Sequence, residues 1–243
     1  MKDRTYPRRG LHGELVHDIG VRILRGELKP GDSLQMDAEA RGETVSRTVV
    51  REAIKVLAAK GLVTARPRTG TQVRERQYWN LLDPDVLAWR LEANPGDDFF
   101  VDVLELRRLL EPAAAGLAAD RTTPVEVEQL ERAVGDMEEA AALDDRDAYL
   151  AADLRFHTLI LEACHNELLA YLGVTLRGVF RASFARTLPI ARETIGQHAA
   201  IAVAISEGDG RAAETAMREL IDRTAASLAE GSAETRLAAS SSA

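Results

Sequence analysis

The ten residues Val45–Ile54 (VSRTVVREAI) constrain the fold of this chain most strongly. Ser46 can cap a helix here, because its hydroxyl can accept a hydrogen bond from an amide of the first turn, and Gly61 can end that helix. One face is apolar at helical spacing: Val50, Ala53, Ile54 and Leu57. A second face is basic, with side chains four residues apart: Arg47, Arg51 and Lys55. This pattern fits either a DNA-recognition helix or an ordinary surface helix with solvated charges, and the flanking sequence decides between them.

The charge of the chain is distributed unevenly. The net charge is −8, but residues 1–76 carry 16 Lys and Arg against 10 Asp and Glu, whereas residues 77–243 carry 15 against 29. A basic first part on an acidic body indicates that only the first part meets a polyanion such as DNA. The single cysteine, Cys164, excludes an internal disulfide and fits a reducing compartment. We find no signal peptide and no apolar run of about 20 residues, so we expect a cytoplasmic protein without a membrane span.

The first 76 residues predict a winged helix-turn-helix module. Leu11, Leu15, Ile19 and Ile23 repeat every four residues, which is typical of a helix, and β-branched residues with a tight turn follow the helix after Ser46. The expected order is a helix ending near Gly26, a turn at 29–32, a weak helix over 36–41, the helix after Ser46, and strands at 62–66 and 71–74 joined by a turn at 67–70.

Three motifs in this module resemble those of GntR-type bacterial transcription regulators: LKPGD at 28–32, VSRTVVREA at 45–53 and RPRTGT at 66–71. The resemblance implies that the helix after Ser46 and the tip of the wing bind DNA, since arginine suits guanine and hydroxyls suit phosphate. The implied contact residues are Ser46, Arg47, Thr48, Arg51, Arg66, Arg68, Thr69 and Gly70. This chain has Gln35-Met36-Asp37-Ala38 where the family usually has a Pro-Ser-Glu-Arg-like start to its second helix, so the segment from Gln35 to Thr44 departs from the family.

The remainder of the chain predicts an antiparallel all-helical bundle, because we find helical segments with clear breaks and no strand pattern. Residues 77–97 are interpreted as a linker that contains both tryptophans of the chain, Trp79 and Trp89. A short helix in this linker is expected to begin at Asp83 or Pro84. Helices are expected over about 98–120, 124–143, 147–164, 168–186, 190–207 and 211–230, and residues 231–243 are expected to form a disordered tail.

The body, residues 98–230, resembles the FCD effector domain of the FadR subfamily of GntR regulators. The matching pieces are LRRLLEP at 106–112, DLRFH at 153–157, CHN at 164–166, and Gln197-His198 followed by AVAISEGD at 202–209. The linker is most similar to that of the sugar-acid branch, such as galactonate or gluconate repressors. Together the two resemblances imply a mainly α, two-domain, ligand-responsive regulator.

Asp153 and His157 are four residues apart, so both side chains leave one face of a helix, and neighbouring apolar residues predict that this face is buried. The resemblance adds His198 as a third ligand of a divalent metal such as Zn, Ni or Mn, and it puts Leu220 where a fourth ligand is usual. Three interpretations stay open: a metal bound by Asp153, His157 and His198 with an open side, direct binding of a hydroxylated ligand by the same groups, or a structural Asp–His pair.

Arg107 is the first candidate for binding an effector carboxylate, because a guanidinium matches a carboxylate bidentately. Arg177 and Arg181 are second candidates, and all three could also be solvated helix charges. The sequence thus predicts a homodimeric, DNA-binding repressor of sugar-acid catabolism that a small carboxylate, an aldonate, releases from its operator. The alternatives are the same regulator type responding to another acid such as lactate, and a metal-dependent hydrolase. We expect no enzyme, because no nucleophile–base pair or general acid is recognisable beside the three candidate ligands.

Overall fold

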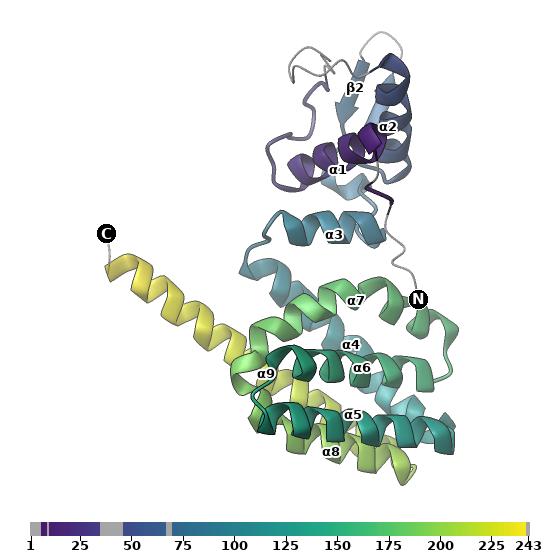
Figure 1. Ribbon diagram of the computed structural model, residues 1–243, viewed down its shortest axis with the longest axis vertical. Helices are drawn as coiled ribbons and strands as arrows, with labels where there is room; N and C mark the ends of the chain where they lie inside the picture. The colour runs from purple at the N-terminus through teal and green to yellow at the C-terminus, as the bar shows by residue number, and fades with distance from the viewer. Residues whose placement is uncertain (1–5, 9, 35–45, 67–69, 242–243) are drawn as a thin grey trace. The chain divides into compact units, whose positions relative to one another are not determined.

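The computed structural model describes residues 6–8, 10–34, 46–66 and 70–241. The chain divides into two compact units, Met1–Pro95 and Gly96–Ala243. Within the described residues it contains nine α-helices, two short 3-10 helices and one two-stranded sheet (Figure 1). The prediction of a mainly α protein with a winged helix-turn-helix followed by a helical bundle is confirmed.

The first unit is built on helices α1 (Gly10–Leu24) and α2 (Arg47–Ala59) and on the hairpin of β1 (Val63–Arg66) and β2 (Gly70–Val73). The predicted cap of α2 is present, since the Ser46 hydroxyl accepts from the Val49 amide at 3.3 Å. The apolar stripe of α2 turns inward, with Ala53 and Leu57 fully buried. They join a common core with residues of α1, of β1 and β2, and of the turn before β1: Val16, Ile19, Ile23, Leu62, Val63 and Val73.

The hairpin is antiparallel, with Val63 opposite Val73 and Arg66 opposite Gly70. Gly61 follows α2 with φ 76°, a left-handed conformation that glycine adopts at little cost, so the predicted helix stop is confirmed. The predicted second helix at 36–41, the departure from the family between Gln35 and Thr44, and the turn residues 67–69 lie outside the described residues.

Most of the segment expected as a linker, residues 77–95, falls in the first compact unit. Helix α3 (Pro84–Glu92) follows the 3-10 turn η1 (Arg76–Tyr78) and begins at the Asp83 cap, whose carboxylate accepts from the amides of Asp85 and Val86. Trp89 is 4% exposed and belongs to the same core as α1 and α2. A Cβ at Gly20 would lie 2.6 Å from Cζ3 of Trp89, so only glycine lets the indole approach α1 this closely. Local sequence patterns do not reveal this long-range packing.

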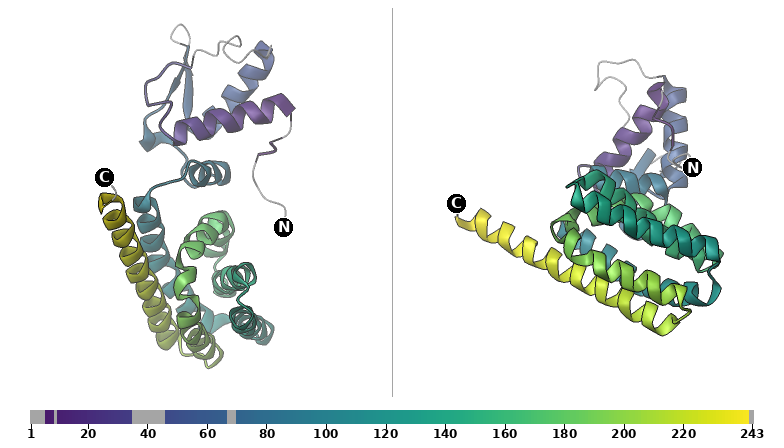
Figure 2. Two further views of the ribbon diagram at one scale, coloured as in Figure 1. Left: turned by 60° about the vertical axis from the view of Figure 1, so that its left-hand side comes forward. Right: turned by 60° about the horizontal axis from the view of Figure 1, so that its bottom comes forward.

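The second unit is a bundle of six helices (Figure 2). In chain order they are α4 (Asp97–Arg121), α5 (Pro124–Ala142), α6 (Arg146–Ala163), α7 (Glu167–Thr187), α8 (Ala191–Ser206) and α9 (Gly210–Ser241), with the 3-10 turn η2 (Leu188–Ile190) before α8. Side-chain caps fix several helix starts; Thr123 and Glu126 form a reciprocal capping box before α5, and Asn166 caps α7. Helix α4 packs against α6, α7, α8 and α9, so its buried face lies at the centre of the bundle.

Helices α9 and α7 bear on two expectations for this unit. Helix α9 continues to Ser241 and runs on beyond the other helices of the bundle (Figure 2), whereas the sequence predicted a disordered tail from residue 231. The segment is rich in alanine and contains no proline, so a helix can continue through Gly231. Helix α7 has a length and an apolar composition that would also suit a membrane span, properties that a buried core helix shares. In the bundle, however, its apolar residues Leu176, Val179, Phe180 and Phe184 are buried against neighbouring helices, as in a core helix.

Candidate functional site

The exposed face of α2 carries the residues predicted to meet DNA. Ser46, Arg47, Thr48 and Arg51 are all exposed. Arg47 and Arg51 have no ion-pair partner within the described part of the chain, whereas Lys55 pairs with Glu52 at 2.7 Å. Two guanidinium groups that no described residue pairs, at the N-terminal end of an exposed helix, can bind phosphate or a guanine edge.

The hairpin carries the rest of the predicted DNA surface. Arg66 ends β1, and Gly70 begins β2 with φ 78°. Arg68 and Thr69 lie outside the described residues.

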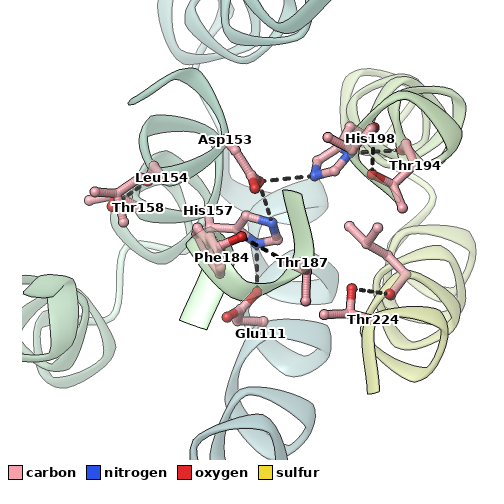
Figure 3. A network of polar contacts seen from close by, with 12 residues as sticks. Glu111, Asp153, Leu154, His157, Thr158, Phe184, Thr187, Thr194, His198 and Thr224 are labelled. Carbon is pink, nitrogen blue, oxygen red and sulfur yellow. Dashed lines mark hydrogen bonds and ion pairs between the residues drawn. The ribbon is translucent and has the colours of Figure 1, made fainter. Parts of the chain in front are cut away.

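The three predicted metal ligands come together in the second unit (Figure 3). Helix α6 supplies Asp153 and His157, and helix α8 supplies His198. Oδ1 of Asp153 lies 3.2 Å from Nε2 of His157 and 3.2 Å from Nε2 of His198. One possible ligand atom from each residue lies within 4.8 Å of the other two. The prediction that these residues form one cluster is therefore confirmed.

The cluster is buried, which perturbs its protonation equilibria. Burial opposes the charged form of Asp153, but hydrogen bonds and charge from His157 and His198 outweigh burial and lower the pKa of this carboxyl. Burial likewise opposes the charged form of His157, but Glu111 and Asp153 outweigh it and raise the pKa of the imidazole. In the absence of a metal, the arrangement therefore favours a charged carboxylate beside a charged imidazole.

Glu111 is a member of the site that the sequence did not reveal (Figure 3). It lies on α4 and is fully buried, with Oε2 2.6 Å from Nδ1 of His157 and Oε1 2.7 Å from Nε of Arg107. The contact with His157 is close enough for an ion pair, although the imidazole N–H is not aligned for a regular hydrogen bond. Burial alone would raise the pKa of Glu111, but Arg107 and His157 reverse this effect and lower it to about 2. An Arg and a Glu four residues apart on a helix are typical of a surface pair, so no sequence pattern indicates this role.

The three candidate effector arginines differ in burial and in their distance from the Asp–His cluster. Arg107 is 2% exposed and lines a cavity with the Asp–His cluster, whereas Arg177 and Arg181 are exposed on α7 and do not line it. Nε and Nη2 of Arg107 donate to Glu111, at 2.7 and 3.4 Å, and its guanidinium lies over the ring of Phe184 at 4.2 Å. Among the described residues Nη1 has no hydrogen-bond partner. Glu111 thus occupies one edge of the guanidinium, and among the described residues the N–H groups of Nη1 remain free for a ligand carboxylate.

The cavity beside the cluster is small and mostly enclosed by polar groups. Its volume of about 20 Å³ admits one or two water molecules. Besides Arg107 and the cluster, four hydroxyl-bearing side chains line it: Tyr149, Thr187, Thr194 and Thr224. Leu220 also lines it, so the position at which the family resemblance expects a fourth ligand faces the cavity but offers only a hydrocarbon. A ligand larger than water therefore requires movement of the side chains or helices that line the cavity.

The donor set fits a divalent metal ion. Nδ1 of His198 lies 2.8 Å from the Thr194 carbonyl, to which it can donate, and Nδ1 of His157 faces Glu111. Both imidazoles can therefore present the lone pair of Nε2 toward Asp153. Two imidazole nitrogens and one carboxylate suit Zn, Ni or Mn, with remaining positions open to water or ligand oxygens.

Comparisons with known proteins match a family model to each of the two units. Residues 11–73 match the model of bacterial regulatory proteins of the gntR family, and residues 102–223 match the FCD domain. The galactonate operon transcriptional repressor of Escherichia coli is 36% identical over 85% of this chain and 92% of its own length. An Escherichia coli protein named for regulation of the L-lactate dehydrogenase operon is 31% identical over 87% of this chain and 83% of its own length.

Solved structures support the same assignment. Streptococcus agalactiae GntR is 26% identical to this chain, with a TM-score of 0.50 over 87% of this chain and 97% of that protein. Family and relatives are transcriptional regulators and not enzymes, so the hydrolase alternative is set aside. With a gntR-type DNA-binding module followed by an FCD domain, the chain belongs to the GntR family of bacterial transcriptional regulators.

Proposed function

We propose that this regulator is a repressor of sugar-acid catabolism and that an aldonate releases it from its operator. One observation carries the proposal: Arg107, Asp153, His157 and His198 converge on one buried cavity in the FCD domain. A cation and several hydrogen-bonding groups on one cavity suit a small carboxylate that bears hydroxyls. The 36% identity to the galactonate operon repressor supports an aldonate as the first candidate.

In this proposal Arg107 binds the carboxylate of the effector through Nη1, while Asp153 and the hydroxyls of Tyr149, Thr194 and Thr224 are available to the hydroxyl groups of the sugar acid. The cavity of about 20 Å³ is smaller than such a ligand. Binding therefore requires that the helices around the cavity repack, and a ligand that prefers the expanded arrangement shifts the population toward it. This repacking is the proposed signal to the DNA-binding unit.

A divalent metal is part of the proposal. Asp153, His157 and His198 would hold it, and when bound it would supply a fixed positive charge next to the effector carboxylate and hydroxyls. Because Leu220 contributes no ligand, more positions remain open than with four protein ligands. The remaining alternatives are direct ligand binding by the same three side chains without a metal, and a structural role of the cluster.

For DNA binding we propose contacts from Ser46, Arg47, Thr48 and Arg51 of the recognition helix and from the wing at Arg66, Arg68, Thr69 and Gly70. We further propose a cytoplasmic homodimer, because one winged helix supplies few base contacts and a two-fold protein reads a palindromic operator. A second effector class, lactate or a related short hydroxy acid, is supported by the 31% identity to the lactate-operon relative.

A thermal-shift screen tests the effector assignment. D-galactonate, D-gluconate and L-lactate are added separately to protein loaded with Mn²⁺ and to protein treated with chelator. An aldonate should raise the melting temperature, since a ligand that binds only the folded state stabilises it. If lactate stabilises and the aldonates do not, the alternative effector class replaces the first. If the chelator leaves the melting temperature unchanged with and without acid, the metal is removed from the proposal.

A further inference from the structure

Glu111 stands between the two halves of the proposed effector site. One half is Arg107, which supplies positive charge, and the other is His157, which belongs to the Asp–His cluster. Both partners contact the same carboxylate, at 2.7 Å from Nε of Arg107 and at 2.6 Å from Nδ1 of His157. All three side chains are at most 2% exposed, so water does not compete for these contacts.

Each contact leaves one particular atom of the partner available. On His157, Glu111 occupies Nδ1, and Nε2 therefore remains for Asp153 and the cavity. On Arg107, Glu111 accepts from Nε and Nη2, and Nη1 is left without a hydrogen-bond partner among the described residues. Phe184 restricts both partners further, since its ring lies 4.2 Å from the guanidinium carbon and 4.9 Å from the imidazole centroid.

We infer that Glu111 is a positioning residue that couples the two halves of the site, orienting Nε2 of His157 toward the metal or ligand and leaving Nη1 of Arg107 for the effector carboxylate. The inference rests on the proposed function, because it assigns Glu111 a role in the same cavity. A carboxylate shared in this way links the two binding events. Any movement of Glu111 that accompanies carboxylate binding at Arg107 is transmitted to His157, and the reverse also holds.

A purely structural Glu111 would act differently. It would stabilise α4 against α6 and α7, and its replacement would lower the melting temperature without changing binding by the folded fraction. A positioning residue predicts losses at both halves, because carboxylates that orient metal-bound histidines typically contribute 10- to 100-fold to metal affinity.

The test uses full-length Glu111→Gln, with Glu105→Gln as a matched control on the exposed face of the same helix. Mn²⁺ is titrated into metal-stripped protein by calorimetry, and D-galactonate is titrated into Mn²⁺-loaded protein. We expect Glu111→Gln to lose roughly 10- to 100-fold in Mn²⁺ affinity and to bind galactonate more weakly as well. Glu105→Gln should match wild type in both titrations.

Glu111→Asp keeps the charge and shortens the reach, and it serves as the second variant if Glu111→Gln does not fold. It should retain part of both affinities, giving values between wild type and Glu111→Gln. Wild-type affinities for both ligands in either folded variant would overturn the inference and leave the proposed function standing. A wild-type protein that binds neither Mn²⁺ nor any of the tested acids would overturn the proposed function, and the inference with it.

Discussion

At the scale of single residues, Arg51 tests the DNA-binding surface. It is exposed on α2 and unpaired among the described residues. Arg51→Ala should weaken operator binding by roughly 1–3 kcal/mol if it reads a guanine, or weaken binding to all DNA sequences about equally if it contacts phosphate. Fluorescence anisotropy at fixed salt measures both. Arg132→Ala, at an exposed arginine of α5, is the control. Operator affinity equal to wild type would remove Arg51 from the DNA surface.

A substitution at Leu220 tests whether the cluster binds a metal ion. It is 2% exposed and lines the cavity with Asp153, His157 and His198. Leu220→His places an imidazole where the FCD resemblance expects a fourth ligand, and we expect Mn²⁺ or Ni²⁺ to bind roughly tenfold more tightly or better, equivalent to about 1.4 kcal/mol. Calorimetric titration of metal-stripped protein measures the change. Unchanged or weaker binding by the folded variant would show that the three donors do not form a metal site open toward α9.

The lowered pKa of Glu111 also predicts how the free energy of unfolding depends on pH. Its pKa is about 2 in the folded protein, against roughly 4.3 for an unperturbed glutamate. Because the folded pKa is lowered, this carboxylate contributes stability that is fully present above the unfolded pKa and is lost as pH falls toward the folded pKa. The contribution is on the order of 3 kcal/mol. Urea unfolding between pH 5 and 3 should show a steeper loss of stability for wild type than for Glu111→Gln, and parallel curves would contradict this.

Among the secondary-structure elements, α3 packs against α1 through the contact between Trp89 and Gly20. A Cβ at Gly20 would meet the indole, so Gly20→Ala should displace Trp89 and destabilise the first unit by about 1–3 kcal/mol. Gly135→Ala is the matched control, because Gly135 is exposed within α5 and its Cβ would meet no atom within 4 Å. The control should stabilise the protein by about 0.5–1 kcal/mol. Equal effects of the two substitutions on denaturant unfolding would mean that Trp89 does not require the glycine.

Elements whose signals are local could be predicted from the sequence. The Ser46 cap, the Gly61 stop and the proline at the start of α5 are contained within a few residues, and the corresponding helices begin or end near the predicted positions. The packing of α3 against α1 could not be predicted, because it depends on the contact between Trp89 and Gly20, which are distant in sequence.

The same distinction applies to the site. Asp153 and His157 share a helix face, and family resemblance added His198, so their convergence was predictable. The role of Glu111 was not, because only the packing of α6 and α7 over α4 turns an ordinary helical Arg–Glu pair into a buried one. That packing also occupies two nitrogens of Arg107, which changes its predicted contact with a ligand carboxylate.

At the scale of the whole molecule, charge and packing divide the chain at nearly the same place. Residues 1–76 are basic and residues 77–243 are acidic, while the two compact units meet at Pro95 and Gly96. Helix α3 therefore belongs to the DNA-binding unit despite its acidic residues. The connection begins after Asn94, whose φ of 53° is unusual for a residue other than glycine.

We predict that an aldonate in the FCD cavity releases the regulator from DNA. The most direct measurement is fluorescence anisotropy of a labelled operator, selected from random DNA by the protein itself and titrated with D-galactonate at fixed salt and Mn²⁺. We predict that wild type dissociates as galactonate rises, and that Asp153→Asn, which keeps the size of a cavity residue but removes its charge, needs more galactonate for the same release. If wild type stays bound to the operator at saturating galactonate and gluconate, an aldonate does not release it. If both proteins are released equally, Asp153 takes no part in the response to galactonate.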